Sequence, residues 1–93
     1  MVQRSAVIQN KAGIHVRPSG VIMNEVSPYE GKVILEKEDV EVELTSIMAL
    51  LSLGLVQGDR ITIRIEGPDE NKTAEKLVEL FQHNFDYPGR ESG

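Results

Sequence analysis

Residues 13–19 read Gly-Ile-His-Val-Arg-Pro-Ser and hold the side chains best suited to chemistry. His15 precedes a position at which Pro18 favours a first helical turn, so its ring would lie beside free backbone N–H groups and the positive end of the helix dipole. Neutral imidazole is a competent nucleophile near pH 7, and a helix start attracts phosphate. Arg17 would neutralise the phosphoryl oxygens, and Gly13 lets the chain turn. The segment predicts a phosphoryl-accepting histidine, with an ordinary surface histidine as the alternative.

Ser46 is the second candidate, at the start of the apolar run 47–51. A serine there is a helix N-cap that stabilises the protein by about 1 kcal/mol, and this role alone would account for a serine at position 46. Phosphorylation would instead add about −1.5 to −2 charges at a helix start that tolerates them. It would change the surface around Ile47, Met48 and Leu51, which a short helix cannot hide completely. We interpret that surface as a docking face for partners, and a dianion at its edge would weaken the binding of an acidic partner.

Other kinds of site find little support in the sequence. Nucleotide, zinc and calcium motifs are absent, and there is no cysteine. The sequon at 71–73 falls in a predicted helix, and His83 has no arginine or helix start beside it, so we interpret neither as a site. A run of acidic residues would suit a metal site or a carboxylate pair, but its alternation with valine is typical of a solvated sheet face: Glu36, Glu38, Asp39, Glu41 and Glu43. We therefore expect no cofactor and no metal.

Length and charge narrow the class of protein. Ninety-three residues that are 40% hydrophobic make one domain with one modest core. A net charge of −5 argues against binding to nucleic acid or to an anionic membrane surface, and it favours protein partners. The longest apolar stretch is too short to span a membrane, and the first residues lack a secretory signal. We expect a cytoplasmic protein.

The hydrophobic pattern predicts seven elements that position these residues. Strands are expected over 2–9, 32–37, 40–44 and 61–66, and helices over 17–26, over 47–51 and after the turn at 67–69. Apolar stripes are expected at Val21, Ile22 and Val26 of the first helix and at Ala74, Leu77, Val78, Phe81 and Phe85 of the last. The order β-α-β-β-α-β-α predicts a two-layer α+β domain, an antiparallel sheet with helices on one face and water on the other. The domain should span 1–85, with a frayed tail over 86–93.

Both candidate segments resemble one family, and the resemblance covers almost the whole chain. The segment Gly13-Ile14-His15-x-Arg17-Pro18 is similar to the phosphorylation loop of the HPr family, the histidine-containing phosphocarriers of the bacterial phosphoenolpyruvate-dependent sugar phosphotransferase system. The segment Ser46-Ile47-Met48-x-x-x-Ser52-Leu53-Gly54 resembles the regulatory-serine segment of that family. The resemblance implies the open-faced β-sandwich βαββαβα, a four-stranded antiparallel sheet with three helices on one face.

The resemblance also implies a role for each site. His15 would accept a phosphoryl group on its ring Nδ1 from phosphorylated enzyme I and pass it to the IIA domains of sugar permeases, with Arg17 assisting. Ser46 would be the target of an ATP-dependent HPr kinase/phosphorylase. The surface expected to meet these partners consists of Ile47, Met48, Leu51 and Gly54. The protein would be a carrier and not an enzyme, and we expect a monomer.

The chain departs from the family pattern at a few positions, which are Ala12, Val16, Gly20 and Thr45. The nucleophile itself is intact. A second interpretation is a regulatory interaction module in which phosphorylation of Ser46 switches binding to a kinase, a transcription regulator or a metabolic enzyme, without sugar transport. A third is a small metabolite-binding domain, which would need an apolar pocket that the short predicted loops leave little room for.

Overall fold

The computed structural model of the chain describes residues 1–11, 13–14 and 16–83. Its elements follow the expected order, and they are β1 (Val2–Val7), α1 (Val16–Val26), β2 (Lys32–Lys37), β3 (Val40–Glu43), α2 (Ile47–Leu51), β4 (Arg60–Glu66) and α3 (Glu70–Gln82). The predicted tail over 86–93 and the predicted core residue Phe85 lie outside the described residues. Within the described part, the predicted order βαββαβα is confirmed.

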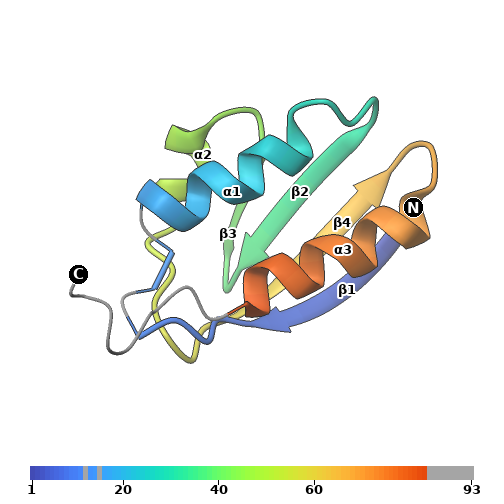
Figure 1. Cartoon of the computed structure of the whole chain (residues 1–93). Helices are drawn as coiled ribbons and strands as arrows, with labels where there is room; N and C mark the ends of the chain where they lie inside the picture. Colours follow the sequence, from blue (N-terminus) through green and yellow to red (C-terminus); the bar gives the residue numbers. More distant parts are fainter. Residues whose placement is uncertain (12, 15, 84–93) are drawn as a thin grey trace.

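The four strands form one antiparallel sheet in the order β1-β4-β2-β3. The helices lie on one face of this sheet, with α1 and α3 running along it and α2 beside α1, while the other face is open (Figure 1). This is the predicted open-faced β-sandwich. Because helices cover only one face, a central strand needs an apolar side chain at every second position, and β2 and β4 show this pattern.

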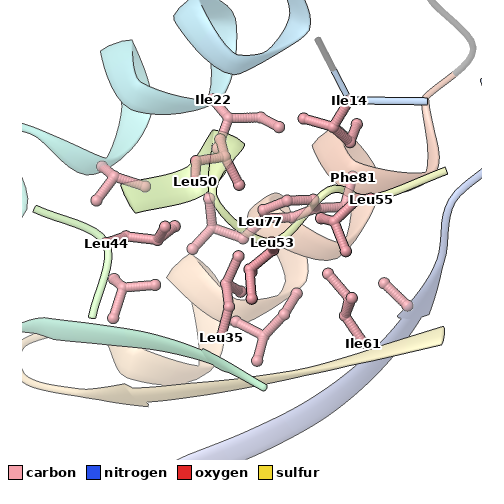
Figure 2. Packing of buried hydrophobic residues seen from close by; sticks show 14 of the residues in the cluster. Ile14, Ile22, Leu35, Leu44, Leu50, Leu53, Leu55, Ile61, Leu77 and Phe81 are labelled. Carbon is pink, nitrogen blue, oxygen red and sulfur yellow. The ribbon is translucent and has the colours of Figure 1, made fainter. Parts of the chain in front are cut away.

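The core lies between the sheet and the helices. From β4 it receives Ile61, Ile63 and Ile65, all buried, while Thr62 and Arg64 alternate with them on the open face. Helix α3 contributes the predicted residues Ala74, Leu77 and Phe81 to the core, and Val78 packs against its margin. Figure 2 shows Ile61 of β4 in the same cluster as Leu77 and Phe81 of α3.

Two details of the sequence prediction are wrong. Val21, expected in the apolar stripe of α1, is 40% exposed, and Met23 is buried in the core instead. Strand β1 ends at Val7 and does not reach Gln9. The Ile8 N–H still donates to the carbonyl oxygen of Asp59, in register with the ladder. The ladder ends there because the Ile8 carbonyl accepts the N–H of Gly58, while the N–H of Asp59 donates to the carbonyl of Val56.

The acidic residues of the hairpin lie on the solvated side, as expected. Arg64, in the centre of the open face, makes ion pairs with Glu36 of β2 and Glu41 of β3. Among the residues that the structure describes, no group of His, Asp and Glu side chains is arranged to hold a metal ion. No helix in that same part of the chain is long and apolar enough to cross a membrane.

Candidate functional site

The segment that leads into α1 is a tight turn held against a distant loop. The N–H of Gly13 donates to the carbonyl of Asn10 at 3.0 Å, and Gly13 has a φ of +75°. The N–H of Ile14 then donates to the carbonyl oxygen of Leu55 at 3.0 Å. A Cβ atom on Gly13 would lie 2.3 Å from that same oxygen, so glycine is required both by the backbone angle and by the space.

Ile14 fixes this turn to the body of the protein. Its side chain is buried and points into the core that also contains Leu55 and Phe81 (Figure 2). His15 follows directly in the sequence and lies outside the described residues. The backbone before it is therefore held twice, once by the hydrogen bond of the Ile14 N–H and once by the buried Ile14 side chain.

Helix α1 begins at Val16, which places Pro18 in its first turn as predicted. Pro18 and Ser19 are buried, so the first turn packs against the protein, while Arg17 is on the exposed side. A helix start leaves backbone N–H groups without partners in the helix and carries the positive end of the dipole. This arrangement suits an anion attached to the residue just before α1.

Ser46 is the N-cap of α2, as expected. Its backbone is extended, with φ −162° and ψ 165°, and its Oγ accepts a hydrogen bond from the N–H of Ala49 at 3.2 Å. Ser46 itself is exposed. Of the three apolar residues predicted to form a surface beside it, Ile47 is 38% exposed, Met48 is 73% exposed and Leu51 is half-buried.

The structure brings Arg17 of the first candidate site and Ser46 of the second to one groove. An open groove of about 500 Å³ runs between α1 and α2. Arg17 and Gly20 line it from α1, and Ser46 and Ile47 line it from the start of α2. Gly54, also predicted to contact partners, is an exposed residue with a φ of +59° that follows α2. The groove therefore joins α1 to the start of α2, two segments that are far apart in the sequence.

Sequence reasoning missed two charged residues beside the turn, Lys37 and Asp59. An Asp59 carboxylate oxygen accepts the N–H of Val56 at 2.8 Å and lies 3.0 Å from the Lys37 ammonium. Accepting this backbone hydrogen bond holds the pKa of Asp59 below its ordinary value, and Lys37 lowers that pKa further, against the opposing effect of burial. Nothing in the sequence marks either residue, because each is a common charged residue at the end of a strand or in a loop.

Comparison with known proteins now decides the family. A family model described as "PTS HPr component phosphorylation site" matches residues 2–83. The chain belongs to the HPr family. It is therefore a member of a family of phosphocarriers and not an enzyme.

The chain is similar to HPr family proteins from several bacteria. It is 30% identical over 86 residues to "Phosphocarrier protein HPr" of Treponema pallidum, covering 92% of this chain and 98% of that protein. It is 34% identical over 82 residues to "HPr-like protein Crh" of Bacillus subtilis, covering 88% of this chain and 96% of that protein. Among solved structures, HPr from Bacillus anthracis matches with a TM-score of 0.81 and 31% identity, covering 87% of this chain and 96% of that one.

Proposed function

We propose that this HPr family member accepts a phosphoryl group on His15 from phosphorylated enzyme I and passes it to the IIA domains of sugar permeases. The proposal is carried by the two residues that flank His15 in the sequence: Ile14 is anchored to the core, and α1 begins at Val16. In the transfer, a bond forms between phosphorus and a nitrogen of the His15 ring while the bond between phosphorus and the donor breaks. The helix start and Arg17 would stabilise the phosphoryl oxygens.

The test is the intact mass of the protein after incubation with phosphoenolpyruvate and a catalytic amount of enzyme I. We expect one phosphoryl group that is lost in acid, because phosphohistidine is acid-labile and phosphoserine is not. His15→Ala should abolish this uptake. His83→Ala is the matched control, since His83 is exposed at the far end of α3, and it should take up the phosphoryl group at the normal rate.

Retained uptake in a folded His15→Ala protein would overturn the proposal. A wild-type protein that takes up no phosphoryl group would do the same, provided that enzyme I is active on another carrier. In that case the regulatory interaction module would become the leading interpretation.

Regulation through Ser46 is the second part of the proposal. Ser46 is exposed and lines the same groove as Arg17, so a phosphoryl group on it would place negative charge beside the surface that partners would use. We expect an ATP-dependent HPr kinase to add one acid-stable phosphoryl group. Ser46→Ala should prevent this modification and Ser52→Ala, at the other end of α2, should not.

The regulatory module without sugar transport remains the alternative function. It is favoured by the similarity to the protein named HPr-like protein Crh and by the place of Ser46 on the groove. The two functions differ in one observable. A carrier gives its phosphoryl group to a IIA domain, whereas a purely regulatory module binds its partner only when Ser46 is phosphorylated and transfers nothing.

A further inference from the structure

One peptide group in the loop after α2 is held at both ends. The carbonyl oxygen of Leu55 accepts the N–H of Ile14, and the N–H of Val56, which belongs to the same peptide group, donates to Asp59 at 2.8 Å. The C=O and N–H of a trans peptide point in opposite directions. The two hydrogen bonds therefore fix the rotation of this peptide plane, and with it the direction in which Leu55 presents its oxygen to Ile14.

The sheet holds the carboxylate of this arrangement in place. Lys37, at the end of the central strand β2, has its ammonium 3.0 Å from Asp59 and donates to the carbonyl of Gly54 at 3.4 Å. Both side chains of the ion pair are mostly covered, at 21% and 22% exposure, so solvent screens the pair less than a fully exposed one. A continuous chain of polar contacts thus runs from β2 to the residue before His15, and each bond in such a chain polarises the next.

We propose that Lys37 and Asp59 are positioning residues for phosphoryl transfer, acting through the Leu55–Val56 peptide to hold the backbone at Ile14. The inference rests on the proposed function, in which His15 accepts the phosphoryl group. Neither residue touches that group. Their effect is on the placement of the nucleophile, and small misplacements of a reacting group lower rates strongly.

The first measurement is amide hydrogen exchange at Ile14, which reports its hydrogen bond to Leu55 directly. In Asp59→Ala we expect the Ile14 amide to exchange about tenfold faster, because the Leu55–Val56 peptide is then free to rotate and its hydrogen bond to Ile14 can open without global unfolding. The amide of Ile63, in the centre of the sheet, should exchange as in the wild type. Lys37→Met is the milder variant, since it keeps the Asp59 bond to Val56, and it should raise the Ile14 rate less.

The second measurement is the steady-state rate of phosphoryl uptake from enzyme I. We expect Asp59→Ala to lower kcat about fivefold to tenfold with little change in the KM for this protein, because the docking groove is unaltered while the nucleophile is misplaced. Lys37→Arg keeps the cation and should restore the rate lost in Lys37→Met.

Lys76→Met is the matched control. It breaks another lysine–carboxylate pair, with Glu25 at 3.3 Å, which joins α3 to α1 away from this loop. It should leave both the Ile14 exchange rate and kcat unchanged. An Ile14 amide that stays protected in Asp59→Ala, or a kcat that stays normal although Ile14 exchanges faster, would overturn the inference.

The two proposals fail in distinguishable ways. If the wild-type protein takes up no phosphoryl group, the proposed function fails and the role in phosphoryl transfer fails with it. The Ile14 exchange rates would then still show whether Lys37 and Asp59 hold the turn. If the wild type is phosphorylated normally, and the Asp59 and Lys37 variants keep the same Ile14 exchange rate and kcat as Lys76→Met, then the inference is wrong and the proposed function stands.

Discussion

The start of α2 and the turn that leads into α1 carry the two phosphorylation sites proposed for this chain, and they are held in different ways. Ser46 is fixed by its own helix, through the hydrogen bond that its Oγ accepts from Ala49. The turn before α1 is fixed from outside, since Ile14 bonds to Leu55 and Leu55 lies in a loop tied to the sheet by Asp59.

The difference teaches what each site depends on. A local cap depends only on the few residues that form it, so the conformation of Ser46 is determined by its own helix. The turn before α1 depends on contacts between segments far apart in the sequence, so changes in β2 or after α2 reach it. A change at Ser46 should therefore leave the turn before α1 undisturbed.

The largest expected effect is at Gly13. In Gly13→Ala the new Cβ would meet the Leu55 oxygen at 2.3 Å in a left-handed backbone, so we expect a loss of about 3 kcal/mol in the free energy of unfolding, or a displaced turn. Denaturant unfolding and Ile14 amide exchange would measure the two outcomes. Gly54→Ala is the matched control, because its φ is +59° with nothing near the Cβ position, and it should cost only about 1 kcal/mol. Equal losses in both variants would show that backbone strain alone, and not the clash with the Leu55 oxygen, sets the cost of Gly13→Ala.

The sequence predicts those features that depend on neighbours along the chain. The strand β4 is evident because Ile61, Ile63 and Ile65 alternate with polar residues, and a half-covered sheet imposes that alternation. The cap at Ser46 is evident because serine before an apolar run favours a helix start. Gly13 is recognisable as a residue for a sharp turn, and its φ of +75° agrees.

The remaining features depend on where distant segments meet. The acceptor for the Ile14 N–H is a backbone carbonyl, which every residue possesses, so no side chain marks Leu55 for this role. The pairing of Lys37 with Asp59 likewise requires the sheet and the loop to be placed first.

The error at Val21 has a local cause. Met23 shares one helix face with Ile22 and Val26. The polar Ser19 lies on that same face and hides the stripe in the sequence.

The next largest effect concerns the local cap. Ser46→Ala removes the acceptor for the Ala49 N–H and should lower the free energy of unfolding by about 1 kcal/mol, measured by denaturant unfolding. The Ile14 amide exchange should not change beyond this global loss, because the turn before α1 is held independently. Ser52→Ala, which removes a hydroxyl that donates to the Ala49 carbonyl at the exposed end of α2, is the control and should cost about 0.5 kcal/mol or less. Faster Ile14 exchange in Ser46→Ala would show that the two sites are coupled.

Ser46→Asp sharpens the same comparison by adding charge without removing the cap. Stability should stay near that of the wild type, because aspartate caps helices about as well as serine. Uptake from enzyme I should slow by about fivefold. This is the factor expected from about 1 kcal/mol of repulsion between the new carboxylate and an acidic group of enzyme I about 4 Å away in water. Steady-state uptake at two salt concentrations checks the cause, since added salt should narrow the difference from the wild type. Equal rates for the two proteins would remove the regulatory role of Ser46.

The smallest expected effect is the pH dependence of the contact at Asp59. Its folded pKa is lowered, so its contribution to stability is fully present above the unfolded value of about 3.9 and is lost as the pH falls through the folded pKa. The stability difference between wild type and Asp59→Asn, below about 1 kcal/mol at pH 7, should therefore shrink as unfolding is measured at progressively lower pH. Since the hydrogen bond from Val56 is the largest cause of the shift and Lys37 the next, Lys37→Met should keep most of this dependence. Loss of this whole pH dependence in Lys37→Met would show that the ion pair, and not the hydrogen bond from Val56, holds the loop. The turn before α1 would then depend on β2 through Lys37.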